Sequence, residues 1–408
     1  MTTRTRTADA SLPSRMPASA RATLRLLEAL KIGVLDMQLP DGSQARFGTP
    51  RDGEPQAAVR VDDWRVFGAV LSRGDIGFAE AFIEGQWHSP DPVALLHLCL
   101  LNRDALEQLV FGRWWGSLLH RVRHLLNRNS RRGSRRNIHA HYDIGNRFYR
   151  LWLDETMNYS SALFEGDLTR PTAQAQQAKI DRALRECGLQ PGQRLLEIGC
   201  GWGALAETAA RDVGARVVGV TLSDEQLAFG RERMREHGVA ERVDLRLQDY
   251  RDIDDGPFDA IASIEMFEAV GREYWGDYFG ALSRLLRPGG RACIQSITIR
   301  DDLFDRYRRS TDFIQQYIFP GGLLPSRAAF REQAERAGFE VECEHAFGPD
   351  YAETLRRWRA SFLARVPQVR QLGFDTRFLR IWEFYLAYCE AAFATGNTDV
   401  IQFTLRRP

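Results

Sequence analysis

A glycine-rich turn that directly follows a short apolar segment is the feature that most constrains this fold. The segment from Leu195 to Gly203 reads Leu-Leu-Glu-Ile-Gly-Cys-Gly-Trp-Gly, and we predict that it joins a strand to a helix beginning near Ala204. Glycines at such a turn let the backbone approach a ligand closely at the edge of an α/β sheet. The spacing G-x-G-x-G displaces the third glycine of the dinucleotide pattern G-x-G-x-x-G, but the turn alone leaves a dinucleotide-binding fold open.

Strand-like and helix-like segments alternate from about residue 192 to the C-terminus. Apolar strands are predicted at 194–198, 216–222, 243–247, 258–264 and 292–299, and two later strands at 339–347 and 400–405. Helices follow the first two strands, and long helices separate the last two. This alternation predicts an α/β protein with a doubly wound sheet. Together with the glycine turn, it resembles the Rossmann-like, seven-stranded sheet of class I methyltransferases that bind S-adenosylmethionine.

A smaller unit precedes this sheet. Between Lys31 and Trp87, short alternating apolar segments are separated by turn sequences such as Pro40-Asp41-Gly42, which predicts a small α+β domain. We expect a disordered leader at 1–25, the small N-terminal domain at 26–120, an Arg-rich linker at 121–138 and a methyltransferase domain at 139–408.

An acid-free, basic segment connects the two parts. No Asp or Glu occurs between Gln108 and Tyr142, although the net charge of the whole chain is only +1. The arginines of this segment are Arg113, Arg121, Arg123, Arg128, Arg131, Arg132, Arg135 and Arg136. We expect them to contact an anionic membrane surface, where each contributes on the order of 1 kcal/mol. Packing of a basic helix on an acidic neighbouring domain is the alternative, and nucleic acid is not expected as a partner.

Cysteines, histidines and apolar runs exclude other classes of protein. The 6 Cys and 8 His form no C-x-x-C pair or H-E-x-x-H motif, so we predict no metal site and expect buried thiols in a reducing compartment. The longest apolar run, 93–101, is shorter than the roughly 20 residues of a membrane-spanning helix. We therefore expect a cytoplasmic protein that associates peripherally with the inner face of the membrane.

Polar side chains follow the second and third strands of the predicted sheet. Ser223 and Gln226 have the spacing of a capping box at the start of a helix. This local role does not exclude contact of Thr221 and Gln226 with a nucleoside. Asp249 and Tyr250 follow the third strand and have the groups to hydrogen-bond and stack on an adenine.

Six motifs, in this order, give the chain a resemblance to the cyclopropane-fatty-acyl-phospholipid synthases. They are His141–Asn146, Asn158–Ala162, the glycine turn, Thr221–Gln226, Phe267–Gly271 and Tyr317–Pro320. The resemblance extends over residues 30–405 and makes the small N-terminal domain a lipid-associated one. It implies transfer of a methyl(ene) group from S-adenosylmethionine to the cis double bond of an unsaturated acyl chain in a membrane phospholipid, which forms a cyclopropane fatty acid.

The resemblance also implies site residues, position by position. Positions that hold S-adenosylmethionine match Tyr159, Ser160, Gly199, Gly201, Thr221, Gln226 and Tyr250, and we add Glu197, Cys200 and Asp249 as cofactor-binding candidates. The catalytic candidates are Glu268, Tyr317, Gln295, Ser161 and Ile297, at or beside positions that hold a bicarbonate ion thought to act as the base. Three positions depart from the family pattern, because Ser161 replaces a Cys and Ala269 and Gln295 each replace a His. Gln295 cannot become cationic.

The chemistry explains these residue types and leaves alternatives open. An alkene is a weak nucleophile, so catalysis requires alignment with the sulfonium methyl and stabilisation of a carbocation, for which the rings of Tyr159, Tyr317 and Phe319 are suited. Because Ala269 and Gln295 replace His residues beside the expected base, a methyl- or methylene-branched product is also open. A non-catalytic lipid-binding protein is a third reading, and the presence of both Glu268 and Tyr317 argues against it. Acyl length, head group and formation of a homodimer also stay open.

Overall fold

The computed structural model describes residues 16–106 and 144–408, which form two compact units. The described residues of the first unit are 16–106, 309–318 and 373–397. The second unit contains 144–308, 319–372 and 398–408. The expected boundaries placed 309–318 and 373–397 in the methyltransferase domain, whereas both segments group with the N-terminal residues. The Arg-rich segment lies outside the described residues.

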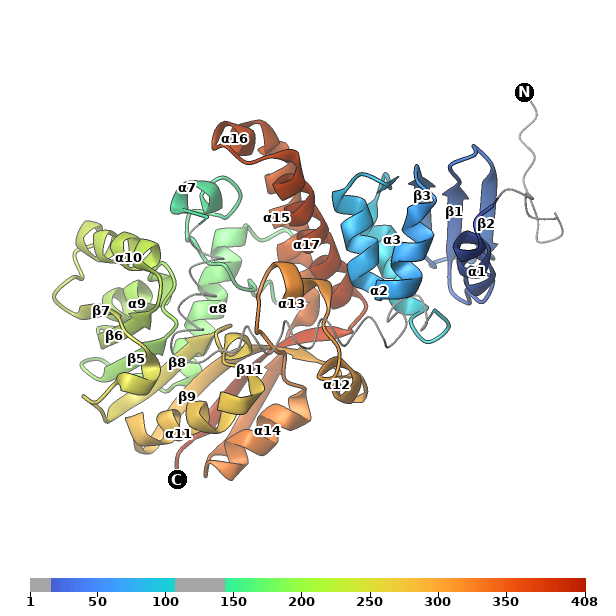
Figure 1. Ribbon diagram of the computed structural model, residues 1–408. Coiled ribbons are helices and arrows are strands. Elements are labelled where there is room, and N and C mark those ends of the chain that lie inside the picture. The colour runs from blue at the N-terminus through green and yellow to red at the C-terminus, as the bar shows by residue number, and fades with distance from the viewer. Residues whose placement is uncertain (1–15, 107–143) are drawn as a thin grey trace. The chain divides into compact units, whose positions relative to one another are not determined.

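The first unit is built on a small mixed sheet with the strand order β2-β1-β3-β4. Its strands are β1 (Val34–Gln38), β2 (Gln44–Gly48), β3 (Gln56–Val61) and β4 (Trp87–His88), and β1 is antiparallel to β2 and parallel to β3. Helices α1 (Ala18–Leu27), α2 (Arg65–Ile83) and α3 (Pro92–Leu101) complete the N-terminal part (Figure 1). The smaller α+β domain is thus confirmed. The leader expected to reach residue 25 is too long, because α1 buries Ala20, Leu24 and Leu27 on one face.

Two helices from late in the sequence complete this unit, α13 (Phe313–Tyr317) and α17 (Thr376–Ala394). Aromatic side chains hold them to the N-terminal helices. Phe384 of α17 lies edge-on to Phe313 with ring centroids 4.9 Å apart, and 5.7 Å from the ring of Phe82 in α2. The apolar pattern of these helices predicts a buried face but does not specify its partner.

The second unit contains a seven-stranded sheet in the order β10-β11-β9-β8-β5-β6-β7. The strands are β5 (Arg194–Ile198), β6 (Arg216–Thr221), β7 (Val243–Leu247), β8 (Phe258–Ile264), β9 (Leu286–Ile299), β10 (Glu340–Ala346) and β11 (Thr398–Arg406). β11 is antiparallel to β9 and β10, and the remaining pairs are parallel. This confirms the predicted doubly wound sheet. One difference is that β9 begins at Leu286, before the expected start of this strand at residue 292.

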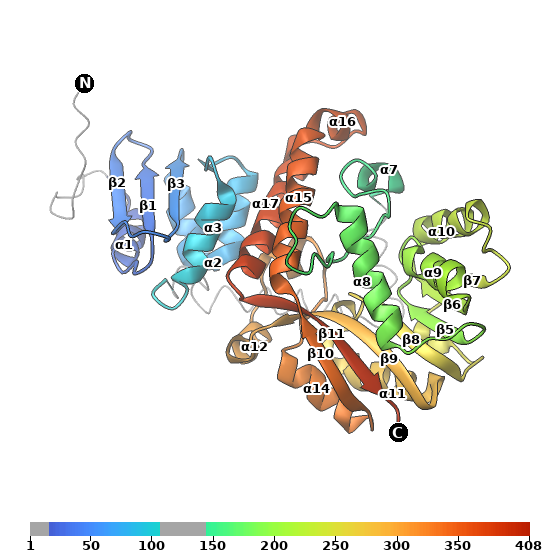
Figure 2. The same cartoon turned by 180° about the vertical axis from the view of Figure 1, so that it is seen from behind.

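Helices cover both faces of this sheet, because neighbouring strand residues point to opposite sides. Leu195 belongs to the core under α8 (Thr172–Glu186), α9 (Ala204–Thr208) and α10 (Asp224–Glu236). Leu196 belongs to the core under α11 (Trp275–Leu285) and α14 (Arg327–Arg336). Figure 1 shows the two layers of helices, and Figure 2 shows them from behind. The remaining helices are α7 (Asn146–Tyr149), α12 (Asp301–Tyr307), α15 (Gly348–Ala364) and α16 (Val366–Gln371). Among the described residues, no helix has the length and apolar composition needed to cross a membrane.

Candidate active site

The glycine turn forms an open backbone cradle at the carboxyl end of β5. Gly199 and Gly201 adopt positive φ angles of 82° and 50°, which side chains rarely tolerate. A Cβ atom added at Gly201 would meet nothing within 4 Å, so space lies beside the backbone there. The N–H groups of Gly199 and Cys200 both donate to the carbonyl of Val220 at 3.0 Å, which ties the turn to β6. A ligand can therefore approach the main chain at this point.

Glu197 provides a buried acceptor beside this cradle. Its side chain is buried near the carboxyl end of β5, and its Oε2 atom has no hydrogen-bond partner within the described chain. Burial raises the pKa of Glu197 to about 8, although the charges of Lys179 and Arg233 oppose that rise. An unpartnered buried carboxyl oxygen is costly without a donor. The ammonium and hydroxyl groups of S-adenosylmethionine are donors of the required kind, so the residues present fit this cofactor.

Thr221 and Gln226 lie together at the end of β6. The hydroxyl of Thr221 donates to Oε1 of Gln226 at 2.9 Å. Ser223 caps α10 as predicted, since its Oγ accepts from the N–H of Gln226 at 3.3 Å. The reciprocal half of the expected capping box is absent within this described segment, because the carboxamide of Gln226 is bonded to Thr221 instead. Both side chains are thereby oriented at the sheet edge that carries the glycine turn.

Asp249 and Tyr250 follow β7 at the same edge. Arg251 holds the carboxylate of Asp249 in a two-point contact, with Nε–Oδ1 at 2.8 Å and Nη2–Oδ2 at 2.6 Å. The ring of Tyr250 meets the ring of Tyr278 edge-on, with centroids 5.5 Å apart. The two predicted residues thus border the site, and their side chains are fixed by neighbours rather than mobile.

Tyr159 and Ser160 lie in a loop that precedes α8. The ring of Tyr159 packs between Trp152 and Trp358, with centroid distances of 5.5 and 5.4 Å. The hydroxyl of Ser160 accepts a hydrogen bond from Nζ of Lys179 at 2.8 Å. Burial lowers the pKa of Lys179 to about 8. The loop is therefore anchored on both sides by buried groups.

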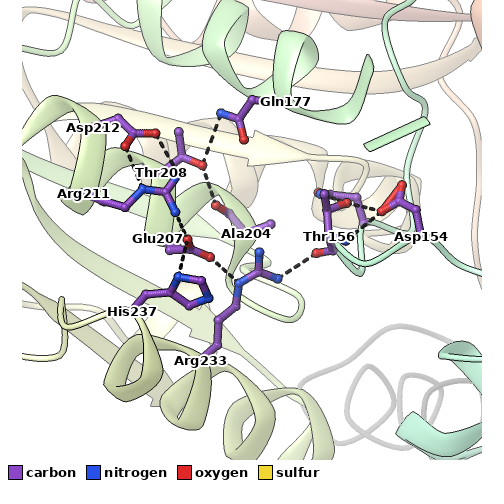
Figure 3. Close-up of polar contacts among 11 residues, drawn as sticks. Asp154, Thr156, Gln177, Ala204, Glu207, Thr208, Arg211, Asp212, Arg233 and His237 are labelled. Atoms are coloured by element: carbon purple, nitrogen blue, oxygen red, sulfur yellow. Dashed lines mark hydrogen bonds and ion pairs between the residues drawn. The ribbon is translucent and has the colours of Figure 1, made fainter. Parts of the chain in front are cut away.

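An ionic network, which the sequence did not suggest, fixes the start of this loop. The backbone carbonyl of Thr156 accepts from Nη1 of Arg233 at 2.7 Å, and Nε of Arg233 lies 2.5 Å from Oε2 of Glu207. Arg211 and His237 also contact Glu207 (Figure 3). The network joins α9 and α10 to the loop that carries Tyr159 and Ser160. Arg233 and Thr156 are 77 positions apart, so no local pattern could reveal their contact.

Glu268 lies in a short 3-10 turn (Phe267–Ala269) that follows β8. Its Oε1 accepts from the N–H of Ile297 and from the hydroxyl of Ser296, the latter at 3.0 Å. Its Oε2 is buried, and no hydrogen-bond partner for it exists among the residues described. Burial, followed by the charge of Glu265, raises the pKa of Glu268 to about 8. Glu268 and Ile297, both expected beside a bicarbonate ion, are instead in direct contact with each other.

Glu265 is a second, half-buried carboxylate, which the sequence patterns did not assign to the site. It follows β8 immediately and has a φ of 49°, unusual for a residue with a side chain. Its Oε1 accepts from the N–H of Ser161 at 2.9 Å and from Nε2 of Gln295 at 2.7 Å, and its Oε2 accepts from the hydroxyl of Tyr351 at 2.6 Å. Burial raises the pKa of Glu265, and these donors oppose the rise. Its position directly after a predicted strand was the available signal.

Gln295 belongs to a buried chain of hydrogen bonds that begins at Arg182. Nη1 of Arg182 donates to Oε1 of Gln402 at 2.6 Å, and Nε2 of Gln402 donates to Oε1 of Gln295 at 3.0 Å. Nε2 of Gln295 then donates to Glu265. Because Arg can only donate, it fixes the orientation of both carboxamides. Gln295 is therefore a donor to a carboxylate and is not itself a base.

The catalytic candidates divide between the two units. Ser161, Gln295, Ile297 and Glu268 come together in the second unit. Tyr317 belongs to the first, where its hydroxyl donates to Oε1 of Glu80 at 2.7 Å and its ring stacks on Phe313 at a centroid distance of 5.3 Å. Over residues 16–106 and 144–408, no group of three or more His, Cys, Asp or Glu side chains is placed to hold a metal ion.

The residues present do not fit a bicarbonate ion. The N–H groups of Ser161 and Ile297 and the Nε2 of Gln295 are the donors that such an ion would use, and all of them are bonded to Glu265 or Glu268. An added anion beside these two half-buried carboxyl groups would also be costly. We therefore derive no step through bicarbonate.

Comparisons with known proteins agree with this geometry. Residues 129–403 match the family model described as mycolic acid cyclopropane synthetase. The tuberculostearic acid methyltransferase of Mycobacterium tuberculosis is 43% identical over 398 residues, which cover 96% of this chain and 92% of that protein. The cyclopropane-fatty-acyl-phospholipid synthase of Escherichia coli K12 is 34% identical over 364 residues, covering 89% of this chain and 91% of the relative.

A solved structure extends the agreement to the fold. The crystal structure of a mycolic acid cyclopropane synthase complexed with SAH and CTAB is 35% identical, covers 67% of this chain and 98% of that chain, and superposes with a TM-score of 0.63. The predicted fold, cofactor and class of reaction, methyl transfer to lipid chains, are confirmed at the level of the family. The chain belongs to the mycolic acid cyclopropane synthetase family of S-adenosylmethionine-dependent methyltransferases.

Proposed function

We propose that this protein transfers a methyl group from S-adenosylmethionine to the cis double bond of an unsaturated acyl chain in a membrane phospholipid, and that ring closure then gives a cyclopropane fatty acid. The observation that carries this proposal is the pair of half-buried carboxyl groups, Glu265 and Glu268, at the carboxyl end of β8. β8 is the direct neighbour of β5, which carries the cofactor cradle. The likeness to the Escherichia coli synthase supports a phospholipid substrate.

The site residues have distinct tasks in this reaction. Bound S-adenosylmethionine supplies an electrophilic methyl group on a sulfonium centre. The glycine turn, Glu197, Thr221 and Gln226 hold and orient it, which replaces a random encounter by a fixed alignment. The two carboxyl groups favour the positive charge that develops on the acyl chain and receive the proton that leaves. Burial of the site also protects the cation from water.

A methyl- or methylene-branched chain is the second candidate product, and Gln295 favours it. In this chain Gln295 is a fixed donor to Glu265. The leaving proton would then be accepted by a carboxyl group of the protein, at a different position from a bound bicarbonate ion. The position of the acceptor decides which C–H bond breaks, and hence whether a ring or a double bond forms. The 43% identical relative, a tuberculostearic acid methyltransferase, supports this product class.

Product analysis of phospholipids tests both candidates. Purified protein is incubated with S-adenosylmethionine and vesicles of dioleoyl phosphatidylglycerol, and the acyl chains are examined by mass spectrometry and proton NMR. Both products add one CH₂, but only the cyclopropane loses all olefinic protons and gains upfield ring protons. Unchanged lipid despite consumption of S-adenosylmethionine would reject the proposal. Binding of the cofactor without any transfer would favour a lipid-binding protein.

We propose further that the arginines between Gln108 and Tyr142 bring the enzyme to the anionic inner face of the membrane. Their charge, unopposed by any acidic residue in that span, carries this proposal. Sedimentation with vesicles should show binding that increases with phosphatidylglycerol content and falls with salt. Replacement of Arg131, Arg132, Arg135 and Arg136 by Gln should weaken it, whereas Arg235→Gln, an exposed change in α10, should not. Equal binding to neutral vesicles would contradict the proposal.

A further inference from the structure

We propose that Glu265 is a built-in carboxylate that accepts the proton released in the last step, so that this enzyme works without added bicarbonate. The inference rests on the proposed methyl transfer to an alkene and deepens it. Three donors from three separate segments converge on this one side chain: the N–H of Ser161, Nε2 of Gln295 and the hydroxyl of Tyr351. Such convergence stabilises the ionised form of a buried carboxylate.

The geometry leaves room on Glu265 for one proton. An ionised carboxylate offers about four acceptor positions on its two oxygen atoms. Two donors occupy Oε1 and one occupies Oε2, so one position on Oε2 remains. Glu268, the neighbouring carboxyl group, differs in its surroundings. It is held by Ile297 and Ser296 on one oxygen, and its other oxygen has no partner within the described residues.

Burial raises the pKa of both carboxyl groups, that of Glu268 to about 8. Glu265 is held by three donors, which favour its ionised form. The charge of Glu265 in turn contributes to the raised pKa of Glu268. Glu265 therefore supplies the negative charge and the acceptor position that a bound bicarbonate ion would otherwise supply.

The backbone at Glu265 supports a specific role for this residue. A φ of 49° is strained for a residue with a Cβ. Such conformations persist only where surrounding contacts determine them. Here the contacts with Ser161, Gln295 and Tyr351 hold the carboxylate at the end of β8, the strand next to β5.

The proposed steps balance in atoms and electrons. The π electrons of the alkene form a C–C bond with the methyl carbon while the C–S bond breaks, and its electron pair stays on sulfur. The acyl chain then carries one positive charge. For the ring, a C–H bond of the transferred methyl group breaks, its proton goes to Oε2 of Glu265, and its electron pair forms the third bond of the ring. For a branched double bond, the C–H bond that breaks lies on a carbon next to the cation, and its proton goes to the same oxygen. The proton later leaves to solvent, which restores the starting charge of the pair.

Bicarbonate dependence and chemical rescue test the proposal. In buffer freed of carbon dioxide, the parent enzyme should methylate dioleoyl phosphatidylglycerol vesicles at the same rate with and without added bicarbonate. Glu265→Gln, which keeps the size of the side chain, should lower turnover by about 100-fold or more and should not respond to anions. Glu265→Gly, which opens space for an anion, should regain at least tenfold of its turnover in formate or bicarbonate.

Controls separate this proposal from a structural role and from the proposed function itself. Both variants should bind S-adenosylmethionine within threefold of the parent by calorimetry, and Glu241→Gln, an exposed carboxyl of the same unit, should match the parent throughout. A parent that requires bicarbonate, a Glu265→Gln variant with parental turnover, or a Glu265→Gly variant that no anion rescues would each overturn the inference. A parent that methylates no lipid would instead overturn the proposed function.

Discussion

The cofactor half and the proton-accepting half of the candidate site are built in different ways. The cofactor half lies at the ends of β5 and β6, and its main residues come from two short motifs, Gly199–Gly203 and Thr221–Gln226. The other half lies at the ends of β8 and β9, and its hydrogen bonds join residues that are far apart in the sequence. The bond between Ser161 and Glu265 spans 104 positions, and that between Gln295 and Gln402 spans 107. A local motif can therefore identify the first half, whereas only the folded chain assembles the second.

The largest difference between the two halves should follow removal of the carboxyl group of Glu268. Glu268→Gln keeps the size of the side chain but removes its proton exchange and weakens its bond with Ile297. We expect turnover to fall by about 10²- to 10⁴-fold, with the affinity for S-adenosylmethionine changed less than threefold. Single-turnover assays and calorimetry measure the two quantities. An equal loss of affinity and turnover would mean that the two halves are not separate.

A smaller difference between the parent and Glu268→Gln is expected in how the free energy of unfolding depends on pH. The folded pKa of Glu268, about 8, exceeds the unfolded value, so the folded state binds more protons between about pH 4.5 and 8. Stability should therefore fall as pH rises through this window, by on the order of 1 kcal/mol per pH unit for this group. Glu268→Gln should lose less stability than the parent between pH 5 and 8 in urea titrations. Parallel curves would contradict the raised pKa.

On the cofactor side, Gly199→Ala should weaken binding of S-adenosylmethionine by about tenfold. The new Cβ would lie 2.9 Å from Cγ of Met266, at a φ of 82°, and the turn would have to shift at a cost of roughly 1–2 kcal/mol. Gly238→Ala is a matched control, because its φ is 66° and a Cβ there meets nothing within 4 Å. Calorimetry should show weakened binding for the first variant alone, and equal losses for both would assign the effect to backbone strain.

The smallest expected effect concerns Arg233, which links the two α helices beside the cradle to the loop that carries Tyr159. Arg233→Lys retains the charge but loses the fork that reaches both Glu207 and the carbonyl of Thr156. We expect the affinity for S-adenosylmethionine to fall about threefold. Arg235→Lys, on the same helix and paired with Glu232 in an exposed contact, should leave it unchanged. A reversed order of the two variants would contradict this assignment.

Local sequence patterns predicted the strands and the helix cap that depend only on neighbouring residues. The bounds of β5, β7 and β8 agree with the expected strands at 194–198, 243–247 and 258–264, because apolar residues alternate or run continuously there. The cap at Ser223 follows equally from its neighbours. The grouping of 309–318 and 373–397 with the N-terminal unit could not be predicted, and the position of Glu265 after a strand did not reveal its hydrogen-bond partners in the site. Both depend on which buried surfaces meet, and amphipathic patterns do not encode the identity of a partner.

The chain of hydrogen bonds from Arg182 through Gln402 and Gln295 to Glu265 has a consequence for the evolution of this site. Every member has a fixed donor or acceptor direction, so a single exchange leaves a buried group facing a partner of the same kind. Gln295→His, for example, changes the partners of both Gln402 and Glu265 at once. Such positions are epistatic: they change together or not at all. A descendant of this enzyme that adopts a different base would therefore have to replace the carboxylate and its amide donor as one inherited block.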